Sequence, residues 1–147
     1  MHHRILIPVQ DQHIHQFLWR NFEANREPDV YIKTVLTFGD KPAPAMAQIA
    51  LRKTAQLNKD KYSQAAEVLT NNVYMDDVCE SVDTVKEAQR LTKKMDEVVK
   101  TGGFSVEGWI CNKMLTEGVK PDTEKGISVC EGEVGKVLGT TWNCKQV

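Results

Sequence analysis

The 147-residue chain lacks several features that would assign it to a class at once. No stretch approaches the ~20 consecutive apolar residues of a membrane span, and the apolar run in the N-terminal MHHRILIPVQ is far too short for the core of a secretory signal. The formal net charge of −1 provides no general excess of positive charge for nucleic acid, so any such binding would need a local basic face. We expect an intracellular protein, in the cytoplasm or the nucleus, that is not secreted and has no membrane partner.

Cysteine is also sparse, and its spacing argues against a common use. The four cysteines form no C-x-x-C pair and have no series of histidines nearby, which disfavours a zinc site and favours buried free thiols. The hydrophobic fraction of 41% and the charged fraction of 27% are those of a globular protein. We expect one ordinary domain with a core of its own, or a fragment of something larger.

The first half of the chain predicts a strand, a hairpin and a helix. RILIPVQ (residues 4–10) predicts a short strand. Segments 15–22 and 30–38 are rich in β-branched and aromatic residues and enclose the turn-forming EANREPD, a pattern typical of a β-hairpin. Two prolines then favour a helix entrance, and apolar residues at helical spacing predict a helix over about 43–58, before a polar break at DKYSQ.

An adjacent pair of carboxylates, Asp76 and Asp77, lies between strand-like residues of segment 67–82, which places the pair at a hairpin turn. Adjacent carboxylates repel each other unless solvent or a cation offsets their charge. Mg²⁺ is commonly held by one or two carboxylates together with substrate phosphates, and two-metal phosphoryl transfer uses this arrangement. The residues alone therefore allow two interpretations, a metal-binding turn or a solvated Asp-Asp turn without function.

A helix follows, and its two ends are marked by local residues. Thr84, or Asp83 before it, suits the N-cap position, Glu87 completes a capping box with Thr84, and a Gly-Gly pair stops the helix, which is predicted over 83–101. A loop is predicted over 113–125, and strands over 104–110, 126–131 and 136–143. This order of elements predicts an α+β fold, with helices packed on one face of an antiparallel sheet.

The chain also resembles a known family. Tyr74-Met75-Asp76-Asp77 resembles the Y-x-D-D box of reverse transcriptases, and the flanking FGDKPAPAMAQIAL and KTGGFSVEGWICNK resemble the polymerase of BEL/Pao-type retrotransposons. The similarity covers nearly the whole chain, and the order of these motifs is more specific than the box alone. The resemblance implies a partial polymerase palm and fingers, an RNA-directed DNA polymerase that acts on a template-primer and a dNTP. It also implies two-metal nucleotidyl transfer with Mg²⁺, or with Mn²⁺ in its place.

The resemblance assigns roles to particular residues. Asp76 matches the carboxylate that ligates the catalytic metals and Asp77 its less directly coordinating neighbour, while Tyr74 and Met75 match residues near the primer end. Lys113 is a weaker match to the basic residue that assists the leaving pyrophosphate, and a solvated lysine is the alternative. The residues that match the nucleotide and template side are Phe38, Gly39, Ala43 and Pro44. The alternative for them is an ordinary turn that enters a helix.

The same resemblance divides the chain, as a partial reverse transcriptase domain, into regions. They are a fingers-like hairpin (15–38), a nucleotide-side loop and helix (39–58), the Y-x-D-D hairpin (71–81), a palm helix (83–101) and palm strands toward the primer grip (104–143). In the relatives the first metal-binding Asp lies just before the segment equivalent to MHHRILIP, so that the upstream polymerase segment with this Asp would be missing. Asp11 is the only substitute nearby, but the resemblance places it past the catalytic position. We expect a truncated domain whose activity in isolation is absent.

Two further interpretations stay open. The chain could be a non-catalytic polymerase relic that acts, if at all, as a nucleic-acid-binding or interaction module. It could also be an unrelated α+β protein with a chance Y-x-D-D, which predicts neither a carboxylate cluster nor a cleft beside Asp76. Basic side chains on the two predicted helices could face a phosphate backbone, although a solvated helix face is the commoner explanation. They are Arg52, Lys53, Arg90, Lys93 and Lys94.

Overall fold

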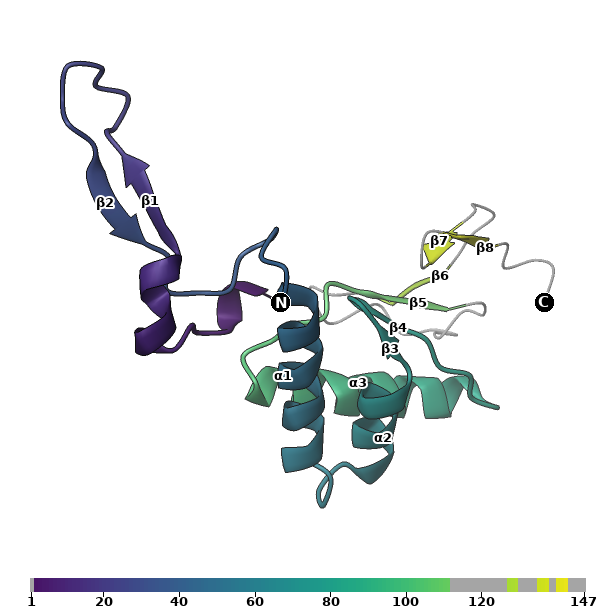
Figure 1. The fold of residues 1–147 in the computed structure, drawn as a ribbon. Helices are drawn as coiled ribbons and strands as arrows, with labels where there is room; N and C mark the ends of the chain where they lie inside the picture. Colours follow the sequence, from purple (N-terminus) through teal and green to yellow (C-terminus); the bar gives the residue numbers. More distant parts are fainter. Residues whose placement is uncertain (1, 112–126, 130–134, 138–139, 143–147) are drawn as a thin grey trace. The chain divides into compact units, whose positions relative to one another are not determined.

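The computed structural model describes residues 2–111, 127–129, 135–137 and 140–142 (Figure 1). The chain divides into two compact units, residues 1–50 and residues 51–147, and each is described by itself. Helix α1 (Ala43–Leu57) begins in the first unit and ends in the second. It confirms the helix predicted over residues 43–58.

The first unit holds two short 3-10 helices, η1 (His2–Arg4) and η2 (Val9–Ile14), and a two-stranded sheet. The predicted hairpin is confirmed, with strands β1 (Gln16–Trp19) and β2 (Asp29–Ile32) that pair antiparallel and are shorter than predicted. Beyond β1 the backbone leaves the extended conformation, because Asn21 and Phe22 have φ values of 51° and 63°.

The predicted strand over residues 4–10 is wrong, because Arg4 ends η1 and no strand forms in this segment. Leu6 forms only an isolated antiparallel bridge with Val35, supported by the N–H of Ile7, which donates to the Thr34 carbonyl at 2.9 Å. Pro8 has no N–H to donate to a ladder, and η2 begins at the next residue. The buried side chains of this unit come from the bridge region and from the start of α1, namely Ile7, Leu36, Ala43 and Ala47.

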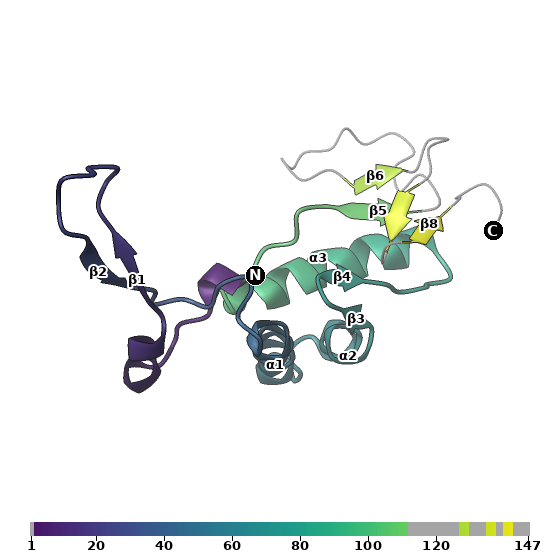
Figure 2. The same ribbon diagram turned by 45° about the horizontal axis from the view of Figure 1, so that its top comes forward.

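The second unit packs the rest of α1 with helices α2 (Ser63–Asn71) and α3 (Val85–Thr101). Helix α2 corrects the prediction of strand-like structure from residue 67, because Ala65, Ala66, Val68 and Leu69 are buried at helical spacing against α3. Burial of one helical face outweighed the strand propensity of this short segment. Figures 1 and 2 show α2 lying beside α3.

Helix α3 follows the prediction at both ends. Thr84 is the N-cap, and its hydroxyl accepts a hydrogen bond from the N–H of Glu87 at 3.2 Å. After the C-cap Gly102, Gly103 takes a φ of +75°, a conformation that glycine adopts without steric cost. The face turned toward α2 buries Leu91, Thr92, Met95, Val98 and Val99.

The remaining strands form two-stranded sheets. β3 (Val73–Tyr74) and β4 (Asp77–Val78) pair antiparallel, as do β7 (Gly135–Val137) and β8 (Thr140–Trp142), whereas β5 (Trp109–Cys111) and β6 (Ile127–Val129) pair parallel. Of the predicted strand over 126–131, the described residues 127–129 are confirmed as β6. The α+β class is also confirmed.

Two strand predictions near the C-terminus need correction. The segment predicted as a strand over 104–110 becomes one only at Trp109, since the N–H of Phe104 still donates to Val99 in α3 at 3.0 Å. The segment predicted as one strand over 136–143 instead contributes to two strands, β7 and β8, that pair antiparallel with each other. The predicted loop over 113–125, with Lys113, lies outside the described residues.

Candidate active site

The two aspartates lie at the tip of the β3–β4 hairpin, which starts directly after α2. The N–H of Asn72 donates to the carbonyl of Val68 at 2.8 Å and ends the helix, and the carbonyl of Asn72 accepts the N–H of Cys79 at 3.1 Å and closes the hairpin. In the register between these ends, Tyr74 lies opposite Asp77. Helix α2 therefore fixes the position from which the hairpin begins, and the predicted hairpin turn at the aspartate pair is confirmed.

Met75 and Asp76 form the two-residue turn of this hairpin. Met75 has a φ of 54°, whereas Asp76 is not among the residues with positive φ, which is the sign pattern of a type II′ turn. Glycine is the usual residue at the first position of that turn, and a non-glycine residue there costs roughly 1–2 kcal/mol. Strain of this kind persists where the surrounding structure fixes it, and it often marks a functional site.

The tip of the hairpin faces solvent. The side chains of Tyr74 and Met75 are 63% and 53% exposed, and Asp76 and Asp77 are exposed as well, while the valines at the base are half-buried. Because Tyr74 and Asp77 are directly opposite each other in the register, their side chains leave the hairpin on the same face. The four residues predicted as catalytic and primer-side therefore share one accessible tip.

The carboxylate pair matches part of the ligand set of a hard divalent cation. Mg²⁺ prefers carboxylate oxygens and commonly completes its shell with waters and substrate phosphates. Within the described part of the chain, no group of three or more His, Cys, Asp or Glu side chains could hold a metal ion. Asp76 and Asp77 thus fit a site that needs further oxygen ligands, such as nucleotide phosphates.

Two polar residues support the hairpin from its base, and sequence reasoning did not select them. The side-chain amide of Asn72 donates to the carboxylate of Glu80, across the same strand ends that the Asn72–Cys79 backbone bond closes. The available signal was an asparagine directly after an apolar helical stripe, a position that favours a helix end. Its partnership with Glu80 depends on the hairpin register and had no local signal.

The residues predicted for the nucleotide and template side lie in the first unit. Phe38 is 71% exposed, and its ring meets the ring of His3 edge-on with a centroid distance of 5.7 Å. Gly39 has a φ of +94°, which explains the need for glycine in the turn that enters α1. Ala43 is buried at the first residue of α1, whereas Pro44 beside it is exposed.

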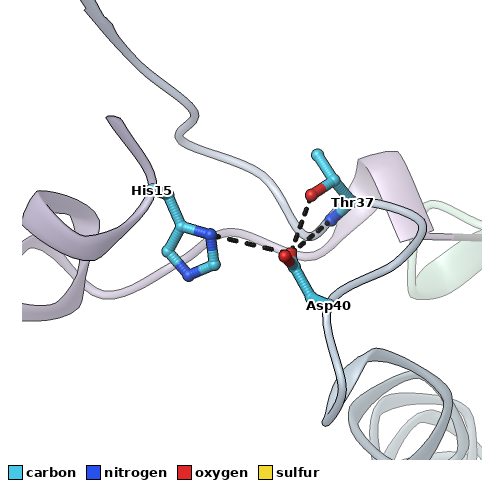
Figure 3. A network of polar contacts seen from close by, with 3 residues as sticks. All are labelled: His15, Thr37 and Asp40. Atoms are coloured by element: carbon cyan, nitrogen blue, oxygen red, sulfur yellow. Dashed lines mark hydrogen bonds and ion pairs between the residues drawn. The ribbon is translucent and has the colours of Figure 1, made fainter. Parts of the chain in front are cut away.

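An ionic network holds this turn (Figure 3). The Asp40 carboxylate accepts hydrogen bonds from the Thr37 hydroxyl at 2.7 Å and from the Thr37 N–H at 3.2 Å, and it lies 3.6 Å from Nδ1 of His15. The hydrogen bond from the Thr37 hydroxyl is the main cause that lowers the pKa of Asp40. Desolvation is the next largest effect and opposes it, while the Thr37 N–H and the charges of His15 and Lys33 lower the pKa further. The sequence did not point to this network.

Asp11, the proposed substitute carboxylate, is exposed in η2, where its N–H donates to the carbonyl of Pro8 at 2.9 Å. Of the basic residues on the helices, Arg52, Lys53, Arg90 and Lys93 are exposed. Among the residues whose positions the structure describes, no helix has the length and apolar character needed to cross a membrane.

Adjacent aspartates exposed on a tight hairpin offer oxygen ligands of the kind that metal-dependent phosphoryl transfer uses. The comparison with protein families identifies the class of protein. The family model described as reverse transcriptase (RNA-dependent DNA polymerase) matches residues 2–128. The chain therefore belongs to the reverse transcriptase family.

No curated protein and no solved structure matches the chain. Membership of the family implies RNA-directed DNA polymerase activity, binding of a nucleic-acid template-primer and the use of Mg²⁺. The interpretation as an unrelated protein with a chance Y-x-D-D is wrong, because the matched region extends from residue 2 to residue 128.

Proposed function

We propose that this chain is part of the RNA-directed DNA polymerase of a BEL/Pao-type retrotransposon and that its β3–β4 hairpin is the metal-binding tip. One observation carries the proposal. Asp76 and Asp77 are exposed at the tip of the hairpin, where Met75 and Asp76 form the turn between the paired residues Tyr74 and Asp77, inside the region that the reverse transcriptase model matches. The BEL/Pao subtype is supported by the sequences on both sides of the hairpin.

The hairpin residues have distinct roles in the proposed site. The carboxylate of Asp76 binds the divalent ion, Mg²⁺ or Mn²⁺, and Asp77 adds negative charge next to it. When bound, the ions lower the pKa of the primer 3′-hydroxyl and stabilise charge on the leaving pyrophosphate. Tyr74, on the face shared with Asp77, contacts the primer end, and the strained turn at Met75 orients Asp76.

The turn before α1 belongs to the nucleotide and template side in this proposal. Phe38 and Pro44 offer the exposed surface, Gly39 permits close approach of a backbone, and the buried Ala43 holds the start of the helix in place. The division of the chain into fingers-like hairpin, nucleotide-side helix, palm helix and primer-grip strands is part of the proposal. Lys113 stays a candidate for the leaving-group side from sequence alone.

A second function has one observation in its favour. The described residues bring only two acidic side chains together at the hairpin, fewer than a two-metal site uses once both ions are held. A polymerase relic that binds nucleic acid without catalysis would need no further carboxylate. The two functions differ in whether the chain extends a primer.

Metal binding and primer extension by the 147-residue chain test the proposal together. Binding of Mn²⁺ is followed by electron paramagnetic resonance in the presence of an RNA template, a DNA primer and a dNTP. We expect Asp76→Asn to weaken Mn²⁺ binding at least about tenfold, which corresponds to the loss of one charged ligand worth ~1.4 kcal/mol or more. The matched control is Asp83→Asn, an exposed acid outside the hairpin, which should change nothing.

The outcomes separate the two functions. Primer extension by the unchanged chain that disappears in Asp76→Asn supports the polymerase. Mn²⁺ and template binding that depend on Asp76 without any extension support the non-catalytic relic. Equal Mn²⁺ affinity of the unchanged chain and of Asp76→Asn would remove the basis of the proposed metal site.

A further inference from the structure

Strand β2 of the first unit has an open backbone edge. The N–H of Lys33 donates to the carbonyl of His15 at 3.0 Å, so these two residues form a hydrogen-bonded pair of the β1–β2 ladder. Such pairs alternate along an antiparallel ladder, so the backbone of Tyr31 also faces β1, whereas Val30 and Ile32 turn their N–H and C=O groups away from β1. In the part of the chain that the structure describes, β2 lies in a sheet with β1 alone.

The open edge is short and is bounded at both ends. Pro28, just before β2, has no N–H with which to extend a ladder. After β2, the carbonyl of Thr34 accepts the N–H of Ile7 at 2.9 Å, so the N-terminal segment already occupies that end. Residues 29–33 between them form an unpaired strand edge, which is a surface that pairs readily with another strand.

The sequence of this edge, DVYIK over residues 29–33, is complementary to itself. A second copy of the chain laid antiparallel beside it, on a two-fold axis at Tyr31, brings Asp29 of each copy opposite Lys33 of the other. The same register brings Val30 opposite Ile32, the two residues whose backbone groups are open. Because two-fold symmetry forms each pair twice, the edge offers two pairs of opposite charge and two hydrogen-bonded pairs.

Other pairings of this hairpin lack that match. A shift of two residues keeps the open backbone groups in phase, but it sets Asp29 or Lys33 opposite Tyr31 and removes the charged pairs. The outer edge of β1 also has open backbone groups, but its residues 16–19, QFLW, include no charge. Charge complementarity therefore selects one edge and one register.

The two charged side chains are accessible for such pairs. Asp29 and Lys33 are exposed at the two ends of the edge. The Asp29 carboxylate accepts a hydrogen bond from Arg26 in the hairpin loop, and the ammonium of Lys33 lies 6.0 Å from the centroid of the Phe17 ring. Neither contact buries the charge, so each side chain is able to meet an opposite charge across the edge.

Pairing of two copies also suits the aliphatic side chains of the hairpin. Leu18, Val30 and Ile32 lie on one face of the two strands, and they are 47–65% exposed. A two-stranded sheet alone is marginally stable in water, and three or more strands with an apolar face are needed for independent stability. Joining two hairpins gives a four-stranded sheet in which these side chains of both copies form one surface.

We propose that this chain forms a homodimer through its β2 edges, with strands in the order β1–β2–β2–β1. The opposite charges of Asp29 and Lys33 in the two copies fix the antiparallel register. Open backbone groups and charge complementarity coincide in this single register. The interface needs neither Asp76 nor a metal ion, and it does not rest on the proposed function.

Charge exchange in the whole chain tests the register. Sedimentation equilibrium of the unchanged chain should show a monomer–dimer equilibrium. Lys33→Glu sets two acidic pairs across the interface and should raise the dimer dissociation constant at least about tenfold, and Asp29→Lys should do the same with two basic pairs. An equimolar mixture of the two variants should regain the mass of a dimer, because every pair between the two different chains again joins opposite charges.

Matched variants separate the interface from effects on folding. Arg20→Glu reverses a charge just after β1, on the same hairpin, and should leave the dimer dissociation constant unchanged. Arg26→Gln removes the ion pair that Asp29 forms within its own chain and should also retain the dimer. The circular dichroism of every variant should equal that of the unchanged chain.

Hydrogen exchange observes the edge directly. The amides of Val30 and Ile32 should exchange more slowly as the chain concentration rises, because the second copy supplies acceptors for these N–H groups. The amide of Leu18 is the control, since it faces the outer edge of β1 and should gain no such protection.

A cysteine at the two-fold axis gives a covalent test of the same register. In a Cys79→Ser background, which removes an exposed thiol, Tyr31→Cys should form a disulfide-linked dimer on mild oxidation. Opposite residues in a non-hydrogen-bonded pair have Cα atoms about 4.5 Å apart, within the range that a disulfide spans. Phe17→Cys in the same background should form no more covalent dimer than the background chain.

Several results would overturn the inference. The unchanged chain could remain monomeric up to millimolar concentration, or Lys33→Glu could dimerise as tightly as the unchanged chain. A mixture of the Asp29→Lys and Lys33→Glu chains that stays monomeric would exclude the proposed register. Concentration-dependent protection of Leu18 in place of Val30 and Ile32 would assign the interface to β1. None of these results bears on Mn²⁺ binding by Asp76.

Discussion

The side chain of Thr54 in α1 occupies the space that a Cβ atom at Gly102 would need. A Cβ built there would lie 2.4 Å from Oγ1 and 2.8 Å from Cγ2 of Thr54, whose side chain is buried. The side chain of Asn58 strengthens the same contact, because its amide donates to the Thr54 carbonyl and to the Thr101 hydroxyl, both at 2.9 Å. The end of α1 therefore packs directly on the C-terminal end of α3.

Gly102→Ala should lower the free energy of unfolding by roughly 1–3 kcal/mol, the usual cost of forcing a methyl group into a packed site. Urea denaturation of the variant and of the unchanged chain measures the difference. Because Thr54→Ala removes both clashing atoms, the double variant should regain part of the loss beyond the sum of the two changes. Simple additivity would contradict the proposed clash.

Gly103 gives a contrasting control for this prediction. A Cβ at Gly103 would meet no heavy atom within 4 Å, but its φ of +75° strains any other residue. Gly103→Ala should therefore cost roughly 1–2 kcal/mol through backbone strain alone, and Thr54→Ala should not change that cost.

The N-cap of α3 supplies a second stability prediction. Thr84→Ala removes the oxygen that accepts the Glu87 N–H, so we expect a loss of about 1 kcal/mol in the free energy of unfolding. Thr84→Ser keeps the acceptor and should keep the stability. Asp83→Ala, at the exposed residue just before the cap, should change it by no more than about 0.5 kcal/mol in urea denaturation. Equal losses at both positions would argue against Thr84 as the cap.

Helix α3 could be predicted from local residues, whereas α2 could not, because it depends on packing between segments far apart in the sequence. Thr84 and the Gly102-Gly103 pair are start and stop signals that act within a few residues of each helix end. In α2, the β-branched Val68 and Thr70 favour a strand by propensity, and the burial of one helical face against α3 decides for a helix. At the N-terminus, the apolar run suggested a strand, but the missing N–H of Pro8 stopped pairing after Leu6.

Only those parts of the candidate site that consist of residues adjacent in the sequence could be predicted. The Asp76-Asp77 pair and its hairpin position follow from residue types and their order. The left-handed conformation of Met75 and the Asn72–Glu80 contact arise from the register of β3 and β4, which single-residue preferences do not determine. The Thr37–Asp40 network likewise joins residues whose geometry depends on the turn at Gly39.

The network around Asp40 predicts a pH effect in acid. Because the pKa of Asp40 is lowered below its ordinary value of 3.8, ionised Asp40 stabilises the folded turn fully above that value. The stabilisation is lost as the pH falls through the lower, folded-state pKa. The amide proton of Thr37 donates to Asp40, so its NMR chemical shift should titrate with a midpoint below 3.8.

Two variants identify the cause of that titration. Asp40→Asn should remove the acid transition from the Thr37 amide, since no carboxylate remains to be protonated. Thr37→Val deletes the hydroxyl that is the main cause of the lowered pKa, so the pKa of Asp40 should rise toward its ordinary value. A Thr37 amide that titrates equally in Asp40→Asn would assign the transition to another group.

The strained turn at Met75 gives the prediction closest to the proposed chemistry. Asparagine tolerates a φ of 54° better than methionine, and the β-branched valine tolerates it worse. We expect Met75→Val to open the hairpin more readily by roughly 1 kcal/mol, seen as an approximately fivefold lower protection of the Cys79 amide in hydrogen exchange. That amide reports on the hairpin because it donates to Asn72 at its base.

Met75→Asn is the matched variant and should protect the Cys79 amide at least as well as methionine does. If the turn orients Asp76, Met75→Val should also weaken Mn²⁺ binding in the presence of template-primer and dNTP, while Met75→Asn should not. Equal Cys79 protection in all three chains would show that the left-handed conformation of Met75 stores no strain. Equal Mn²⁺ affinity despite unequal protection would separate the turn from the metal site, leaving the orientation of Asp76 to the bonds that Asn72 makes at the base of the hairpin.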